Sequence, residues 1–250
     1  MPTVGELTAP YGNYLIPVRP VGPGVCSICR TSVLANYPRC WQCNEALRRL
    51  PDTADAVAFI SLAVKGEQLA YELSGYKNSR NQTARNRMTI GLAAVLWRWL
   101  ASHESCHADA SGTDTFDVVS VVPTTRARDG VHPLQHIVSK LIGPTQERFV
   151  DLLTVNPAAA QDRTPDIDRW HSSPLAGEAV LLIDDTWTTG SAVQSAAARV
   201  KQSGASRVAI VEIGRHFSTV ATSDDYRDAA KDYYRKAKQV AWSWDVCCLE

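Results

Sequence analysis

The segment from Val180 to Ser191 constrains the fold of this chain more than any other part. It reads VLLIDDTWTTGS, in which four apolar residues precede two carboxylates, and small and hydroxyl-bearing residues follow. The apolar run predicts a short buried strand, and the Ala-rich segment Ala192–Val200 predicts a helix after the loop. A buried strand that turns tightly into a helix is the repeating unit of an α/β fold with a parallel sheet.

The loop of this unit, Thr186–Ser191, has the properties of an anion site. The first N–H groups of a helix lack intrahelical partners, and the helix macrodipole adds positive charge there. Gly190 lets the backbone approach a phosphate closely, and the loop also offers the hydroxyl groups of Thr188, Thr189 and Ser191. We therefore expect this loop to hold a phosphate.

Two carboxylates, Asp184 and Asp185, lie between the strand and the loop. At the carboxyl end of a parallel strand they reach the edge of the sheet, where open α/β folds bind ligands. Carboxylates suit the hydroxyl groups of a sugar or a hydrated Mg²⁺. Phosphate, diol and metal within one loop predict a phosphorylated pentose as the ligand. The alternative is an acidic N-cap to the next helix, without a ligand.

The second constraining feature is a pair of CxxC motifs ten residues apart, formed by Cys26, Cys29, Cys40 and Cys43. Each motif makes a tight turn that brings two sulfurs together, and two such turns complete a tetrahedral Zn²⁺ site. Four protein ligands leave no open position, so the predicted zinc is structural. The alternatives are disulfides, a redox motif, and a nucleic-acid-binding knuckle that uses Arg30 and Arg39.

Together these features resemble known families. DDTWTTGS is similar to the phosphoribosyl diphosphate (PRPP) loop of type I phosphoribosyltransferases, with Ser191 where Thr is usual. The cysteine quartet, the Tyr76-Lys77 segment, the Val-Pro strand end and this loop together resemble the competence protein F (ComF) family of bacteria. The resemblance covers roughly residues 26–217. It implies an α/β fold in which a phosphoribosyltransferase-like parallel sheet is flanked by helices and preceded by a small zinc-knuckle module.

The resemblance also implies roles for individual residues. Asp184 and Asp185 would bind the ribose hydroxyls of PRPP, with Mg²⁺ as a second cofactor beside structural Zn²⁺. The phosphate would be held by Thr186, Trp187, Thr188, Thr189, Gly190 and Ser191.

A second strand, loop and helix unit is expected from Phe116 onwards. Arg126 and Arg128 follow its strand, and the planar guanidinium suits phosphate. This is the position of the pyrophosphate loop in type I phosphoribosyltransferases, so the resemblance implies that the two arginines bind the leaving diphosphate. Lys77 opens a basic run that can serve as a flap over the same group. Ordinary surface charges are the alternative for all three residues.

The remaining elements follow from apolar runs and breaker residues. Residues 1–24 are expected to be an irregular arm, and Ala108–Thr115 a polar linker. We expect further strands at Ala56–Val64, Phe116–Pro123, Phe149–Val155 and Arg207–Ile213, and helices at Asn44–Leu50, Gly66–Gly75, Thr83–His103, 132–142 and 223–239. The expected domains are residues 1–50 with the zinc module, 51–222 with the phosphoribosyltransferase-like sheet, and a C-terminal helix and tail at 223–250.

Composition and charge bear on where the protein is located and what it binds. The chain has 250 residues, and its 26 Lys and Arg balance its 26 Asp and Glu, so net charge gives no argument for nucleic acid or membrane. The N-terminus lacks a signal-peptide pattern, and the longest apolar stretch falls short of the roughly 20 residues that span a bilayer. We expect a cytoplasmic protein that does not bind membranes.

Several thiols and imidazoles stay unassigned at this level. His103, Cys106 and His107 have the chemistry of metal ligands, but no matching cluster lies nearby in the sequence, which favours an incidental grouping. Cys247 and Cys248 are adjacent, and adjacent thiols are poor joint ligands.

Two functions of different classes are compatible with these features. The first is an enzyme that transfers the phosphoribosyl group of PRPP to a nitrogenous acceptor and releases pyrophosphate, with Mg²⁺ and arginines stabilising the leaving group. The second is a non-catalytic protein that senses PRPP or a nucleotide and acts in DNA uptake or nucleotide regulation. A local basic face would favour the second despite the neutral net charge. The acceptor, the pathway and the oligomeric state do not follow from the sequence.

Overall fold

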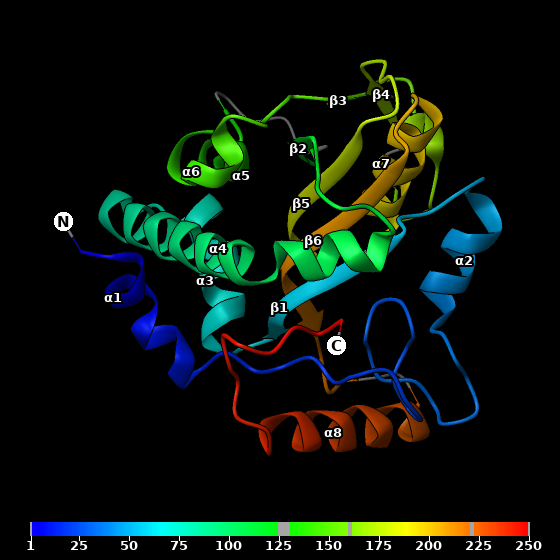
Figure 1. Cartoon of the computed structure of the whole chain (residues 1–250). Helices are drawn as coiled ribbons and strands as arrows, with labels where there is room; N and C mark the ends of the chain where they lie inside the picture. The colour runs from blue at the N-terminus through cyan, green and yellow to red at the C-terminus, as the bar shows by residue number, and fades with distance from the viewer. Residues whose placement is uncertain (1, 125–130, 160–161, 221–222, 250) are drawn as a thin grey trace.

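The computed structural model describes residues 2–124, 131–159, 162–220 and 223–249. Its centre is a parallel four-stranded sheet in the order β1-β6-β5-β2 (Figure 1). The strands are β1 (Ala56–Val64), β6 (Arg207–Phe217), β5 (Ala179–Trp187) and β2 (Val118–Val121). Their near-continuous apolar runs are buried because helices cover both faces of a parallel sheet. This confirms the predicted α/β class.

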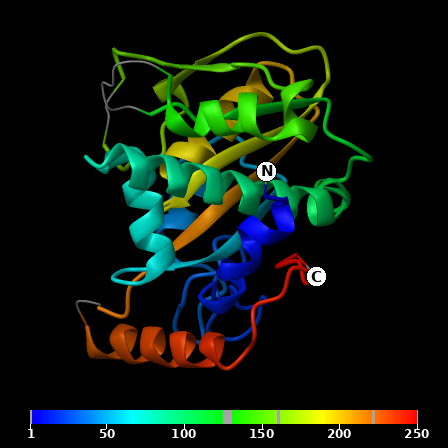
Figure 2. The same ribbon diagram turned by 90° about the vertical axis from the view of Figure 1, so that its left-hand side faces the viewer.

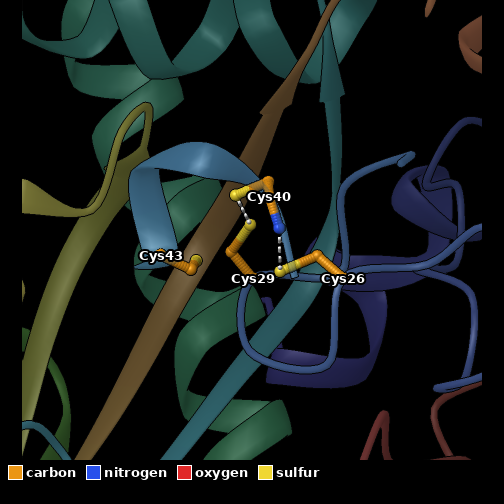
Figure 3. Close-up of side chains that lie close together, drawn as sticks. All are labelled: Cys26, Cys29, Cys40 and Cys43. Carbon is orange, nitrogen blue, oxygen red and sulfur yellow. Dashed lines mark hydrogen bonds between the residues drawn. The ribbon is translucent and has the colours of Figure 1, made fainter. Parts of the chain in front are cut away.

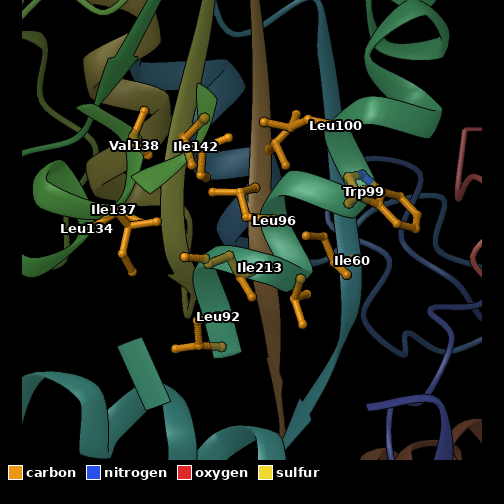
Figure 4. Packing of buried hydrophobic residues seen from close by; sticks show 14 of the residues in the cluster. Ile60, Leu92, Leu96, Trp99, Leu100, Leu134, Ile137, Val138, Ile142 and Ile213 are labelled. Atoms are coloured by element: carbon orange, nitrogen blue, oxygen red, sulfur yellow. The ribbon is translucent and has the colours of Figure 1, made fainter. Parts of the chain in front are cut away.

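One face of the sheet is covered by helices from the middle of the chain. These are α3 (Gln68–Asn78), α4 (Gln82–Ser111), α5 (Pro133–His136), the π-helical stretch η2 (Ile137–Leu141) and α6 (Gly143–Gln146). Figure 2 shows α4 lying across this face. Leu92, Leu96 and Leu100 of α4 belong to the same buried cluster as Ile60 of β1 and Ile213 of β6 (Figure 4). We call this side the α4 face.

The opposite face is covered by α7 (Ser191–Gln202), together with α2 (Trp41–Arg49), α8 (Asp224–Lys238) and the cysteine-containing segment. Helix α2 packs on α7 through Ala46, Leu50 and Ala198. Helix α8 runs along the bottom of the molecule in Figure 1 and buries Ala230 and Tyr233. We call this side the α7 face.

A second, small sheet lies outside the main one. Strands β3 (Leu153–Val155) and β4 (Trp170–Ser172) pair antiparallel, and the 3-10 helix η3 (Ile167–Arg169) leads into β4. The strand expected over Phe149–Val155 is therefore only its last part, and it pairs with β4. Phe149 itself makes a single bridge to Val119 of β2.

The first part of the N-terminal arm is helical, which corrects the expectation of an irregular segment there, whereas residues 14–24 contain no helix or strand. Helix α1 (Val4–Thr8) is followed by the 3-10 helix η1 (Ala9–Asn13). Thr3 and Glu6 form a capping box: the Glu6 N–H donates to Thr3 Oγ1 (3.2 Å), and the Thr3 N–H donates to Glu6 Oε2 (2.7 Å). This signal is visible in the sequence as T-x-x-E.

Two helices run further than expected. Helix α4 continues to Ser111 before Gly112 ends it in the left-handed region, so half of the expected linker is helical. Helix α3 continues to Asn78, so Tyr76 and Lys77 lie in its last turn. Among the residues with described structure, no helix has the length and apolarity needed to cross a membrane.

Candidate functional site

The adjacent residues Asp184 and Asp185 point to opposite faces of the sheet. Side chains alternate along a strand. Leu182 of β5 packs in the cluster of the α7 face, and Ile183 packs in the cluster of the α4 face. By this alternation, Asp184 follows Leu182 toward the α7 face, and Asp185 follows Ile183 toward the α4 face. The carboxylates therefore meet different partners.

Asp185 is held by the end of α3. Its Oδ2 accepts hydrogen bonds from the hydroxyl of Tyr76 and from Nζ of Lys77, the latter at 2.5 Å. The Asp185 side chain is 5% exposed and the Lys77 side chain 21%, so the ion pair is largely shielded from water. Charge-assisted bonds of this kind are stronger than neutral ones. The structure thus brings Lys77, predicted from its basic run, into contact with an acid of the PRPP-like motif.

A cavity of about 330 Å³ opens beside this ion pair. Its polar lining includes Lys77, Thr124, Asp185, Thr186, Thr188 and His216. Burial lowers the pKa of His216, and Arg215 lowers it further, so a neutral imidazole faces the cavity. Arg126 and Arg128 lie outside the described residues, and their expected contact with a diphosphate stays a prediction. Thr124, just before them in the chain, reaches the cavity wall.

The predicted phosphate loop is built as a sharp entry into α7. Gly190 is the N-cap residue and has φ of 79°, in the left-handed region that favours glycine. A Cβ at Gly190 would also collide with the indole of Trp187. Trp187 is buried and packs edge-on against Phe59, with ring centroids 5.5 Å apart. The loop conformation therefore depends on a glycine lying flat against a buried tryptophan.

A smaller cavity of about 120 Å³ lies on the α7 side of the loop. It is lined by the loop from Thr186 to Ser191, by the acids Asp184 and Glu212, and by Arg163 and Arg169. Thr186 and Thr188 line both cavities. The two cavities therefore lie on either side of the segment that follows the acids.

Glu212 is a site residue that the sequence analysis missed. It lies opposite Asp184 in the β5–β6 register and is fully buried. Within the described residues, neither oxygen of its carboxylate has a hydrogen-bond partner. Burial, and then the charges of Asp184 and Asp185, raise the pKa of Glu212 well above its usual value. The one available signal was a single acid inside the apolar run RVAIVEI.

Asp184 has a similar electrostatic environment. Burial, followed by the charge of Asp185, raises the pKa of Asp184 to about 7. Buried carboxylates of this kind are stabilised by a proton or by a cation. The pair of Asp184 and Glu212 therefore offers oxygen ligands that suit Mg²⁺.

The four motif cysteines converge as predicted (Figure 3). Their ligand atoms all lie within 4.8 Å of one another, and the sulfurs of Cys29 and Cys40 are 3.6 Å apart. Tetrahedral zinc with Zn–S bonds near 2.3 Å places its sulfurs about 3.8 Å apart. The first knuckle is closed by the Arg30 N–H, which donates to the carbonyl of Cys26 at 3.1 Å, and the second opens α2. The donor set fits structural zinc.

Arg215 joins this cysteine cluster to the predicted phosphate loop. Its guanidinium is 5% exposed and donates to the carbonyl of Cys29 at 2.7 Å and to Sγ of Cys29 at 3.4 Å. The same group donates to the carbonyls of Trp187 (3.1 Å) and Thr188 (3.3 Å). One side chain on β6 thus anchors the loop backbone to the cysteine module.

No family model matches this chain, and a search of curated proteins also gives no match. The resemblance to the ComF family and to type I phosphoribosyltransferases therefore rests on the cysteine quartet and on the segment Asp184–Ser191. The four-cysteine cluster and the parallel α/β sheet are present in the structure.

Proposed function

We propose that this chain binds PRPP together with Mg²⁺ and transfers its phosphoribosyl group to a nitrogenous acceptor, releasing pyrophosphate. The observation that carries the proposal is the carboxyl end of β5. There, two acids and a hydroxyl-rich turn into α7 line two cavities that share Thr186 and Thr188 in their walls. A phosphorylated pentose presents a diol and a phosphate at a spacing that such an edge can bind.

The phosphate of the ligand would occupy the turn from Thr188 to Ser191. The N-terminus of α7 supplies unpaired N–H groups and the positive end of the helix dipole. Thr189 and Ser191 already face each other, with their hydroxyl oxygens 3.4 Å apart. These groups hold the anion without a charged side chain.

The ribose would lie over Thr186 and use both acids. A sugar placed there meets Asp184 on the α7 side and Asp185 on the α4 side, so each carboxylate can accept from one hydroxyl. Asp185 already accepts bonds from Tyr76 and Lys77, which fix its orientation. Mg²⁺ supplies charge neutralisation for the diphosphate, and Asp184 with Glu212 are the oxygen ligands that suit it.

The transfer step needs little acid–base chemistry from the protein. The acceptor nitrogen forms a bond to C1 of the ribose while the C1–O bond to the diphosphate breaks, and the electron pair of that bond leaves with the diphosphate. The acceptor nitrogen then gives up its proton to solvent. Arg126, Arg128 and Lys77 are the cations assigned to the leaving group.

The second candidate is a PRPP or nucleotide sensor that uses the same site without turnover. The ion pair of Lys77 with Asp185 favours this candidate. The enzyme would use Lys77 to bind the diphosphate, but in the structure the charge of Lys77 is already paired with Asp185. In that case the ligand would exchange with Lys77 at Asp185 and so change the position of α3.

Isothermal titration with PRPP and Mg²⁺ tests the proposal. Wild type should bind, and the Asp184→Asn/Asp185→Asn variant should lose binding. The control Asp224→Asn/Asp225→Asn removes two adjacent acids from the first turn of α8 and should bind as wild type does. A screen of nitrogenous bases for pyrophosphate release then separates the enzyme from the sensor. A folded wild-type protein that does not bind PRPP would overturn the enzyme and the PRPP sensor, and one that binds neither PRPP nor a nucleotide would overturn the sensor altogether.

A further inference from the structure

A second group of metal-ligand side chains is separate from the four motif cysteines. His103 and Cys106 are one turn apart on α4, so they share one face of the helix. Cys247, in the C-terminal tail, joins them, and one ligand atom from each of the three lies within 4.8 Å of the others. The chain thus brings together ligands separated by more than half of its length.

The tail is packed onto α4 around this group. Trp242 stacks near Trp99 of α4, with ring centroids 6.3 Å apart, and the Arg98 guanidinium lies 4.4 Å from the centre of the Trp244 ring. Cys247 itself is 1% exposed and belongs to the core cluster of the α4 face. The cluster is therefore part of the packed interior.

The orientation of His103 suits a metal ligand. Its Nε2 lies 2.8 Å from the carbonyl oxygen of Trp244, and a carbonyl only accepts, so Nε2 carries the proton. The lone pair is then on Nδ1, which lies 3.8 Å from Sγ of Cys106. Metal-bound histidines characteristically donate their other N–H to a carbonyl or carboxylate, which fixes the ring.

His107 provides a fourth donor one turn along the same helix face. It is fully buried, and neither ring nitrogen has a hydrogen-bond partner within the described part of the chain. Buried polar groups without partners are rare in folded proteins. A buried imidazole without a partner in this part of the chain, one helical turn from His103, is a candidate fourth ligand for the group of His103, Cys106 and Cys247.

We propose that His103, Cys106 and Cys247 form a second metal site, with His107 as the fourth ligand, and that it binds Zn²⁺. Two thiolates and two imidazoles are a preferred donor set of tetrahedral zinc, and a separation of 3.8 Å between nitrogen and sulfur fits bonds of about 2.0–2.3 Å. Four protein ligands make the site structural. Its effect is to pin the C-terminal tail to α4.

Metal content of the full-length protein tests the proposal. Protein purified under reducing conditions and loaded with Zn²⁺ should hold about two zinc ions per chain by mass spectrometry. Cys106→Ser and Cys247→Ser should each lose about one. Cys248→Ser is the matched control, because the Cys248 sulfur accepts from the Phe59 N–H at 3.2 Å and lies outside the ligand group. It should keep both ions.

Two further measurements keep the test decisive where a variant folds poorly. His107→Phe preserves a buried ring but removes the fourth donor, and it should lose the second ion about tenfold or more readily to a chelator. Hydrogen exchange in the tail should be slow in zinc-loaded wild type and Cys248→Ser, and fast in Cys247→Ser. One zinc per chain in reduced wild type, or a Cys106–Cys247 disulfide isolated in place of a second ion, would overturn the proposal.

Discussion

The neighbouring carboxylates Asp184 and Asp185 have opposite electrostatic surroundings. Asp185 accepts from Tyr76 and Lys77 on the α4 face. Asp184, on the α7 face, is paired in register with Glu212, whose carboxylate has no partner among the described residues. The charge of Asp185 is therefore balanced within the protein, whereas the charges of Asp184 and Glu212 are not. A cation would therefore gain most on the α7 face.

Removing Lys77 should have the largest effect on stability, because it removes the charge that balances Asp185. Among the described residues, Lys77→Met leaves the buried Asp185 carboxylate with only the Tyr76 hydroxyl, and loss of one partner from a shielded ion pair costs about 3 kcal/mol. Urea unfolding near neutral pH measures the change. The double variant Lys77→Met/Asp185→Asn should recover part of the loss. If Lys77→Met is as stable as wild type, the ion pair does not balance Asp185.

Tyr76→Phe should be the next largest effect. The change removes one of two hydrogen bonds to the Asp185 carboxylate but keeps the ring, which is fully buried. A hydrogen bond to a charged group contributes about 2 kcal/mol. Thermal unfolding measures the loss, and Tyr71→Phe, on the exposed side of α3, is the control that should leave stability unchanged. An equal loss in both variants would contradict the assignment.

Glu212→Gln should increase stability, whereas Lys77→Met and Tyr76→Phe should decrease it. The folded-state pKa of Glu212 lies above its ordinary value of 4.5, so the folded chain binds the proton more tightly than the unfolded chain. Stability contributed by this group is full below about pH 4.5 and falls as pH rises toward the folded pKa. Removing the charge should therefore stabilise the protein at about pH 8, by about 1.4 kcal/mol for each unit of raised pKa. Near pH 4 the variant should be as stable as wild type. A loss of stability at pH 8 would contradict a raised pKa for Glu212.

The smallest expected effect is on Mg²⁺ binding. Because burial raises the pKa of Asp184 to about 7, the acid must lose its proton before it binds a cation. Mg²⁺ affinity of the wild type should rise about tenfold between about pH 6 and 8, as the deprotonated fraction of Asp184 does. Asp184→Asn should flatten this rise, as measured by titration calorimetry. An unchanged pH profile in the variant would assign the titration to another group.

Local patterns in the sequence were enough for the main fold, for the cysteine cluster and for the tight turn before α7. The apolar runs gave the strands of the parallel sheet, because helices bury both faces and the strands contain few polar residues. The CxxC motifs lie close in sequence, so their spacing predicted a cluster that the structure confirms. The tight turn before α7 was predicted for the same reason, since Gly190 and its hydroxyl neighbours are consecutive.

Contacts between distant segments were beyond sequence reasoning. Cys247 is 141 positions after Cys106, and only the path of the tail brings the two together. Glu212 reads as a single acid in a strand, and its role depends on the register with Asp184. The strand expected at Phe149–Val155 was too long because its apolar residues pack in two places, at β2 and at β4.

The bonds of Arg215 would couple the affinity of the cysteine module for zinc to the affinity of the loop for its proposed ligand. The same guanidinium bonds to Cys29 and to the loop carbonyls, so a metal that stiffens the cysteine module also stiffens the loop. Linkage is reciprocal: whatever factor zinc adds to ligand affinity, the ligand adds to zinc affinity. On the proposed function, loss of zinc from the cysteine module would therefore weaken binding of the ligand at the loop.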